Sequence, residues 1–429
     1  MRLRLSTWRG ALLIGALFAF LQIPSAPGHV SPDTSNYAGQ ALRVLDTPGA
    51  RLADEVIGQR CDQQLRLARE RHALNVMEFR DPLDERAVSR HCFRVLRAEA
   101  LVPLPALMGP PGRALAPANR CEAIFLSRPG YAYAVVPFVA AFGLTWGMWG
   151  FALLVTLAGG VLVLLFLRVA GAAVPAALLG QALYYVLPTG YWSMRPLAEG
   201  LVLALSAAVL LGLALVWRGR RRAGCAVTAG AFAAGFAVKY SLFLMLGGWL
   251  ALACAVGLLA GSWDRRGDGV TALALTGGAV ALTAAGVRLL GWPGADDSVM
   301  ELFTNHCRLP DVPDAWQQWR ELSGSYWPLW IRDRLTEPLP LLVWAAGAWW
   351  SLRRPGAAGL FVVATALCGL ATQAAHPDAG EADRLYVHVW FLVVCGVPFA
   401  VDRYARHLFP AEVEEVERCV PPPPRHAWP

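Results

Sequence analysis

The sequence predicts an all-α, polytopic integral membrane protein of about ten transmembrane helices. Of its 429 residues 56% are hydrophobic and 16% are charged, whereas about 25% of the residues in soluble domains are charged. Apolar runs recur along most of the chain, which excludes a soluble core with a single anchor. The basic residues behind the net charge of +7 are therefore interpreted as signals of how the spans are oriented in the membrane. No zinc-finger spacing or RNA-binding aromatic motif indicates a nucleic-acid partner.

The first predicted span follows a basic N-terminus. Arg2, Arg4 and Arg9 precede an apolar run from about residue 10 to 23. This pattern predicts a retained first helix that begins in the cytoplasm, and a cleaved signal peptide is the alternative. In both cases the segment after it lies outside.

The tract 224–261 holds one charged residue, Lys239, which is also the single lysine among 38 basic residues. As one helix this tract would measure about 57 Å at about 1.5 Å per residue, but the core of a bilayer is only about 30 Å thick. We therefore predict two spans that meet at a short turn around Lys239. The apolar runs after the first fall at about 147–168, 173–190, 199–217, 224–238, 241–261, 269–290, 337–352, 357–375 and 386–401.

The arginine clusters predict the orientation of these spans. Alternate loops carry 218–222, 264–266, 353–354, and Arg403 with Arg406. All four clusters are cytoplasmic if the N-terminus is cytoplasmic, as the positive-inside rule requires. Residues 1–409 then form one transmembrane domain, and 410–429 form a disordered cytoplasmic tail. The preference for Arg over Lys suggests a bacterial chain, so we expect the plasma (inner) membrane.

Two long segments, 28–130 and 291–335, are predicted to lie outside. Stretches of the first look helical and amphipathic, with Arg66, Arg69, Glu70, Arg94 and Arg97. The second resembles a helix at the level of the lipid headgroups, with Trp316, Trp319, Trp327 and Trp330. Disulfides are permitted outside the cytoplasm, so we expect one or two bridges of undetermined connectivity among Cys61, Cys92, Cys121 and Cys307.

Polar residues gather at the predicted outer ends of the spans and form the candidate site. Arginine and lysine there suit an anionic, lipid-linked substrate, because they neutralise a phosphate. A carboxylate among them could take a proton from an attacking hydroxyl. The residues, in chain order, are Asp33, Tyr37, Arg128, Tyr131, Arg195, Glu199, Lys239, His376 and Arg384.

This pattern resembles the GT-C class of membrane glycosyltransferases, which includes protein O-mannosyltransferases and the aminoarabinose transferase of lipid A. The similar elements are an acidic residue and a tyrosine after the first span (Asp33, Tyr37), and a Pro-aromatic motif before the second (residues 128–131). Two further elements are similar to those of the family: an Arg-Pro-Leu-x-Glu segment (195–199) and a Gly-rich helix that ends in Lys239. In that family paired acids often follow the first span, whereas Asp33 stands alone.

The resemblance implies an inverting transfer of a sugar from a polyprenyl-phosphate carrier to an acceptor hydroxyl, at the extracytoplasmic face. Asp33 would be the general base, and Lys239, Arg128, Arg195 or Arg384 would stabilise the phosphate. The acceptor is a glycan, a lipid or a protein. No cofactor is expected, and no spacing indicates a metal, although Asp296, Asp297, Glu301 and His306 are acids and a histidine in one segment.

Each candidate residue also has a structural interpretation. Asp33 could cap the helix that follows it, because Pro-Asp-Thr-Ser is typical of a helix N-terminus. Arg195 and Glu199 could form an i, i+4 ion pair. Arg384 and Lys239 could be snorkelling residues at the interface, and His376 could be a plain loop residue. For the whole chain, a transporter or flippase of an anionic or lipid-linked substrate is the alternative function, and a membrane assembly factor is a third.

Overall fold

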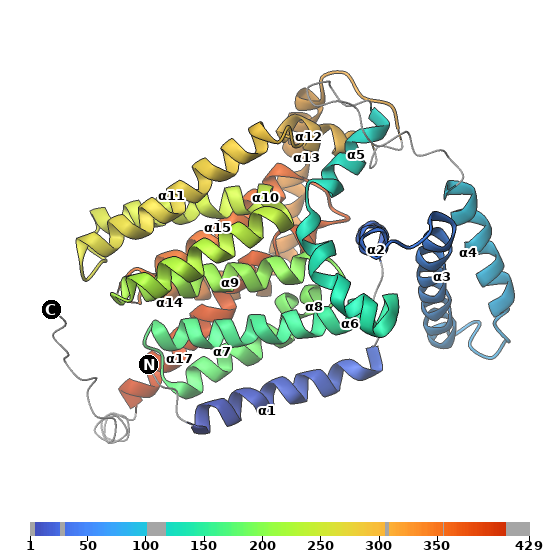
Figure 1. Cartoon of the computed structure of the whole chain (residues 1–429). Coiled ribbons are helices and arrows are strands. Elements are labelled where there is room, and N and C mark those ends of the chain that lie inside the picture. Colours follow the sequence, from blue (N-terminus) through green and yellow to red (C-terminus); the bar gives the residue numbers. More distant parts are fainter. Residues whose placement is uncertain (1–4, 26–30, 101–116, 305–308, 355, 409–429) are drawn as a thin grey trace.

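The computed structural model describes residues 5–25, 31–100, 117–304, 309–354 and 356–408, and every regular element in these ranges is a helix (Figure 1). Within them, seven helical segments are long and apolar enough to cross a membrane. They are α1 (Leu5–Gln22), α6 (Pro129–Val169), α9 (Ala198–Trp217), α10 (Arg221–Leu259), α11 (Arg266–Leu289), α15 (Ala358–Ala375) and Val387–His407, which joins η2 (Val387–Trp390) to α17 (Phe391–Leu408). Two shorter apolar helices, α7 (Val174–Val186) and α14 (Leu339–Leu352), accompany them. The prediction of an all-helical fold is therefore confirmed for the described residues, and the seven long apolar helices are consistent with a membrane protein.

Helix α10 folds back on itself at Lys239, as the length of its apolar tract predicts. Lys239 has extended backbone angles (φ −161°, ψ 71°) between two helical halves. The rings of Phe232 and Phe243 lie 5.9 Å apart, centroid to centroid. Eleven residues along a straight helix would separate them by about 16 Å. The two halves therefore pack side by side, with Lys239 at the tip.

Helix α6 bends in the same way at Gly143, whose φ of 74° is unfavourable for residues with a side chain. The rings of Phe138 and Phe151 lie 5.4 Å apart across this bend. The Pro-aromatic motif at residues 128–131 thus leads into the first part of α6, before Gly143. This first part folds back along the second part, so Arg128 and Tyr131 at its start are held beside the membrane helices.

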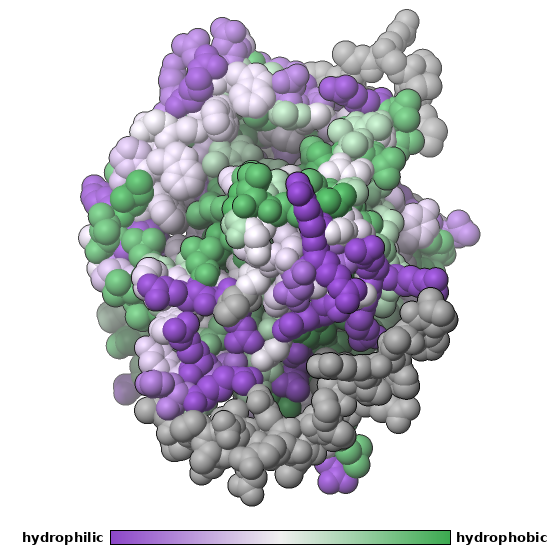
Figure 2. Space-filling model, turned by 90° about the vertical axis from the view of Figure 1, so that its left-hand side faces the viewer, coloured by the Kyte–Doolittle hydropathy of each residue, from purple (hydrophilic) through white to green (hydrophobic). Residues whose placement is uncertain are grey.

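Arginines from loops that are distant in sequence meet at one end of the bundle, on the left in Figure 1. Arg218 Nε donates to the carbonyl of Val169 at 3.0 Å, and Arg354 Nη2 donates to that of Ala170 at 3.0 Å. Arg354 also pairs at 2.9 Å with Asp402, whose side chain is fully buried. The last carbonyls of a helix are unpaired and carry partial negative charge, so cations collect there. Figure 2 looks at this end and shows the hydrophilic side chains gathered on it.

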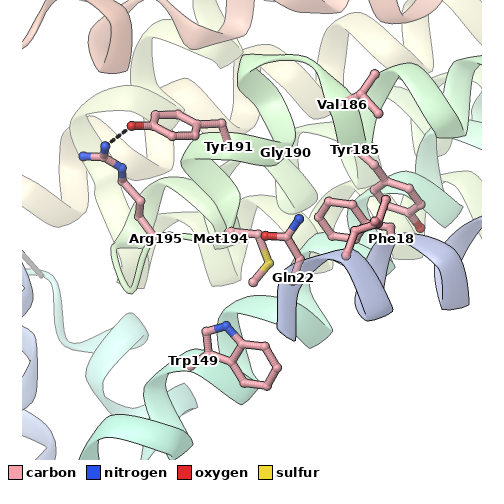
Figure 3. A pocket seen from close by; sticks show the side chains of 10 residues that line it. Phe18, Gln22, Trp149, Tyr185, Val186, Gly190, Tyr191, Met194 and Arg195 are labelled. Carbon is pink, nitrogen blue, oxygen red and sulfur yellow. Dashed lines mark hydrogen bonds between the residues drawn. The ribbon is translucent and has the colours of Figure 1, made fainter. Parts of the chain in front are cut away.

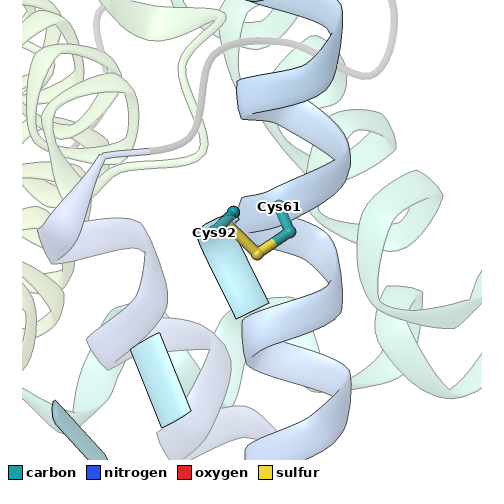
Figure 4. The surroundings of a disulfide bond; sticks show 2 residues. All are labelled: Cys61 and Cys92. Atoms are coloured by element: carbon teal, nitrogen blue, oxygen red, sulfur yellow. A yellow bond between two sulfur atoms is a disulfide. The ribbon is translucent and has the colours of Figure 1, made fainter. Parts of the chain in front are cut away.

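The opposite end of the bundle carries the segments predicted to be outside. Helix α2 (Pro32–Val44) leads to α3 (Gly49–Leu74) and α4 (Glu85–Ala100), which lie at the side of the bundle in Figure 1. Gln59 of α3 donates to the sulfur of Met148 in α6 at 3.8 Å. A disulfide between Cys61 and Cys92 joins α3 and α4 (Figure 4). This is one of the predicted bridges; Cys307 lies outside the described residues, and the side chain of Cys121 is not described either.

The second outer segment contains α12 (Ala295–Phe303) and α13 (Ala315–Thr336), which includes the four predicted interfacial tryptophans. It is tied to α5 (Pro117–Leu126), at the end of the first outer segment, by a bidentate pair in which Arg120 donates to Asp311 at 2.8 Å. The end of the first segment predicted to be outside is therefore in direct contact with the second. The proposed tail, 410–429, lies outside the described residues.

Two glycines of α10 allow the hairpin to be tested. A Cβ at Gly235 would lie 2.4 Å from the ring of Phe243, whereas no atom lies within 4 Å of a Cβ at Gly230. We expect Gly235→Ala to lower the free energy of unfolding by about 1–3 kcal/mol through overpacking. Gly230→Ala should be neutral or stabilise by up to about 1 kcal/mol through helix propensity.

Thermal unfolding of both variants in the same detergent measures this difference. Equal unfolding temperatures for the two variants would contradict the hairpin.

Candidate functional site

Asp33 lies in the first turn of α2 but does not cap it. Ser31 is the capping residue: its Oγ accepts from the backbone N–H of Thr34 at 3.3 Å, and Thr34 Oγ1 accepts from the N–H of Ser31 at 3.1 Å. The capping interpretation of Asp33 is therefore wrong, because the reciprocal capping box is complete without it. The carboxylate of Asp33 faces a cation instead.

That cation is Arg384, in the four-residue helix α16 (Ala382–Leu385). Its Nη1 lies 2.8 Å from Asp33 and 3.0 Å from Glu381, and its Nε lies 3.2 Å from Glu199. Only 16% of the Arg384 side chain is exposed. A snorkelling role is excluded by this geometry, since the guanidinium is turned into the protein and held by three carboxylates.

Lys239 completes the group, because its Nζ lies 3.1 Å from the Oε1 of Glu199. The tip of the α10 hairpin thus reaches the first turn of α9, and Glu199 binds two cations. We call Asp33, Glu199, Lys239, Glu381 and Arg384 the charge cluster. Asp33 and Glu199 lie in first turns, Lys239 lies at a hairpin tip, Arg384 lies in a short connecting helix and Glu381 lies in the loop before it, so the cluster lies at helix ends.

The electrostatics of the cluster are set by burial and by the excess of carboxylates over cations. Burial acts to lower the pKa of Arg384, but Glu199, Asp33 and Glu381 outweigh it and hold that pKa above its ordinary value. Burial raises the pKa of Glu381 against the opposing effect of Arg384. A cavity of about 10 Å³, room for one water, adjoins Glu199, Lys239 and Arg384.

Arg128, Tyr131 and Tyr37 lie beside the cluster. A Cβ at Gly130 would lie 2.8 Å from the backbone of Ala237, so a glycine is needed where the start of α6 packs against the α10 turn. This close approach places the guanidinium of Arg128 over the ring of Tyr240, at 5.8 Å. The rings of Tyr37 and Tyr131 are buried 4.7 Å apart. Burial raises the pKa of Tyr37, so it remains a neutral phenol.

Arg195 does not join the charge cluster, and its predicted ion pair with Glu199 is wrong. An i, i+4 pair requires a continuous helix, but α9 begins at Ala198 and Arg195 lies in the turn before it. Its guanidinium bonds to the hydroxyl of Tyr191 and lies 4.3 Å from the centre of the Trp192 ring. Arg195 lines a separate pocket, shown in Figure 3.

His376 lies at the C-terminal end of α15, five residues before Glu381. Its backbone carbonyl accepts a bond from Gln373 Nε2 at 3.2 Å, which fixes the start of the loop that carries Glu381 and Arg384.

Two residues of the site were not among the sequence-based candidates. Glu381 pairs with Arg384, and the buried His388 adjoins the same small cavity, with its Nε2 3.0 Å from Ser206 Oγ. His388 had a usable signal, because an ionisable residue within an apolar run is unusual. For Glu381 the sequence signal was weaker: its i, i+3 spacing from Arg384 is compatible with an ion pair on one face of a helix.

Metal binding finds no support in the described part of the chain, where no three His, Cys, Asp or Glu side chains are arranged to hold an ion. Asp296 accepts a bond from the indole of Trp316 at 2.7 Å, and Asp297 accepts one from the N–H of Gly294 at 2.8 Å. These acids therefore have structural partners. His306 lies outside the described residues.

No protein-family model matches the chain, and no curated protein sequence or solved structure matches it either.

The raised pKa of Glu381 predicts a pH-dependent stability. A carboxyl whose pKa is higher in the folded than in the unfolded state stabilises fully at low pH, and this contribution is lost as the pH rises through the folded pKa. Glu381→Gln keeps the neutral form at all pH values. We expect the variant to unfold at a higher temperature than the natural protein near pH 7, and the two to converge below about pH 4, under the ordinary pKa of Glu.

Thermal unfolding at several pH values measures the difference in unfolding temperature between Glu381→Gln and the natural protein. Glu337→Gln, at the exposed end of α13, is the control and should give a curve parallel to that of the natural protein. The prediction would be contradicted if the unfolding temperatures of Glu381→Gln and the natural protein moved further apart as the pH falls.

Proposed function

We propose that this protein is a GT-C-like membrane glycosyltransferase that moves a sugar from a polyprenyl-phosphate carrier to an acceptor hydroxyl. The observation that carries the proposal is the Asp33–Arg384 contact at 2.8 Å. It joins a carboxylate after the first span to a cation before the last, within a cluster built from helix ends. Four of the residues that the sequence analysis selected as candidates, Asp33, Glu199, Lys239 and Arg384, come from distant segments and lie in this cluster.

The proposal includes a topology of ten spans. The two halves of α10 count as separate spans, and the shorter α7 and α14 cross the membrane with the other helices. The arginine-rich end is then cytoplasmic by the positive-inside rule. The charge cluster faces the extracytoplasmic side of the plasma membrane, together with α3, α4 and their disulfide, which suits an oxidising compartment.

In the reaction, a lone pair of the acceptor hydroxyl attacks the anomeric carbon while the bond from that carbon to the phosphate oxygen breaks. The bonding electrons leave with the polyprenyl phosphate, and the hydroxyl proton passes to the carboxylate of Asp33. The phosphate leaves as an anion, so no general acid is required. Attack on the face opposite the leaving group inverts the configuration.

The cations of the site stabilise the leaving phosphate. Lys239 and Arg384 already contact carboxylates, whereas Arg128 has no carboxylate partner among the described residues and its Nε is buried without a hydrogen bond. Arg128 is therefore the cation with free capacity, and we assign it the first contact with the donor phosphate. The Tyr240 ring lies under the guanidinium of Arg128, and the buried rings of Tyr37 and Tyr131 pack against each other.

A transporter of an anionic lipid is the alternative. Transporters place charged groups near the bilayer midplane, on broken helices. The charge cluster instead lies at helix ends, which favours a surface reaction over passage through the bundle.

Removal of the proposed base tests the enzyme. We expect Asp33→Asn to lower sugar transfer by about 10²–10⁴-fold, the range for loss of a general base, in membranes supplied with candidate polyprenyl-phosphate sugars. Asp46→Asn, at the exposed end of the same helix, is the control and should leave transfer unchanged. Transfer by Asp33→Asn at the natural rate would rule Asp33 out as the base.

Lys239→Arg tests whether the hairpin tip needs a compact ammonium. Lys239 is 15% exposed and adjoins a cavity with room for about one water, so a guanidinium has little space there. We expect transfer to fall at least about tenfold, because guanidinium and ammonium do not substitute for each other at a confined site. Unchanged activity with a correctly folded variant would mean that the position needs positive charge alone.

A further inference from the structure

A pocket separate from the charge cluster lies between the C-terminal ends of α1 and α7, the second part of α6 and α8 (Pro188–Ser193) (Figure 3). Its volume is about 330 Å³, within the range of small-molecule sites. One wall is apolar and buried, with Phe18 stacked on Tyr185 at 4.7 Å. At the rim, the side chains of Leu21 and Val186 are exposed, so the pocket opens sideways from the bundle rather than into its core.

The polar part of this pocket has unused hydrogen-bonding capacity. Arg195 bonds to the Tyr191 hydroxyl and stacks on aromatic rings, but no described carboxylate forms an ion pair with it, and its Nε is buried without a partner. The indole nitrogen of Trp149 is also buried without a partner. Figure 3 shows this nitrogen turned toward Gln22 and Met194, inside the pocket.

The arginines at the other end of the bundle provide a contrast. Arg218 and Arg354 also line a pocket, but their guanidiniums donate to carbonyls at the end of α6, and Arg354 pairs with Asp402. Those cations are explained by the helix end that they cap. Arg195 caps no helix and neutralises no described acid, so within the described protein its charge meets only the Tyr191 and Trp192 rings and the Tyr191 hydroxyl.

We propose that this pocket binds a membrane lipid whose phosphate-bearing headgroup carries a net negative charge. Arg195 donates to the phosphate oxygens, the Trp149 indole donates a further hydrogen bond, and the first part of an acyl chain lies against Phe18 and Leu21. Buried unpaired donors favour an anion, and the sideways opening beside exposed apolar residues favours a lipid over a soluble phosphate. The proposal does not depend on sugar transfer, because none of these residues belongs to the charge cluster.

The test uses the purified full-length protein in a neutral detergent, with dioctanoyl phosphatidylglycerol and dioctanoyl phosphatidylcholine as probes and native mass spectrometry as the readout. We expect the anionic lipid to bind about tenfold tighter to the natural protein, the effect of one charge-assisted contact. Arg195→Gln should remove this preference, and Trp149→Phe should weaken anionic-lipid binding by about two- to threefold.

Arg334→Gln is the matched control, since Arg334 also lies over a tryptophan, Trp330, and has a buried, unpartnered Nε. It should keep the preference. Val186→Trp, at an exposed position of the rim, should lower the affinity for both lipids by filling the pocket, and it keeps the test valid if Arg195→Gln fails to fold.

Three results would overturn the proposal: equal affinity of the natural protein for the two lipids, an unchanged preference in folded Arg195→Gln, or displacement of the anionic lipid by equimolar inorganic phosphate. The last result would identify a site for free phosphate.

Discussion

The ion contacts of Arg384 hold together the end of the bundle that lies opposite the arginine-rich end. Its guanidinium meets Asp33 from α2, Glu199 from α9 and Glu381 from its own loop. Lys239 then joins Glu199 from the tip of α10. Loss of Arg384 would leave the charge cluster with three carboxylates and Lys239 as its one cation, and an uncompensated buried charge typically costs about 3–5 kcal/mol. The positions of α2, of the first turn of α9 and of the loop before α16 therefore depend on one guanidinium.

The sequence predicted much of the fold because a bilayer imposes simple rules on length and charge. The tract around Lys239 is too long for one crossing, and the structure folds it back there. The arginine clusters share one compartment in the prediction and meet at one end of the bundle in the structure. The candidate site could be predicted in part, since Asp33, Glu199, Lys239 and Arg384 were all chosen and are in contact.

The remaining features depended on local geometry and on tertiary contacts. The spacing of Arg195 and Glu199 suggested a pair, but Pro196 and Leu197 precede the first turn of α9, so the two side chains diverge. The segment 31–35 contains several residues that can cap a helix. Ser31 caps α2, whereas Asp33 pairs with Arg384, a residue so distant in sequence that no local pattern indicates the contact. The cavity beside His388 forms from segments that no local pattern connects.

The three carboxylates around Arg384 also have a consequence for how a ligand would enter. They act as internal counter-ions, so an incoming phosphate competes with groups that are already seated. Under the proposed function, binding would then be an ion exchange: the phosphate would take over part of the guanidinium, and one carboxylate would be released. If the released group is Asp33, arrival of the donor would free its carboxylate to act as the base. Without substrate the carboxylate would remain ion-paired with Arg384.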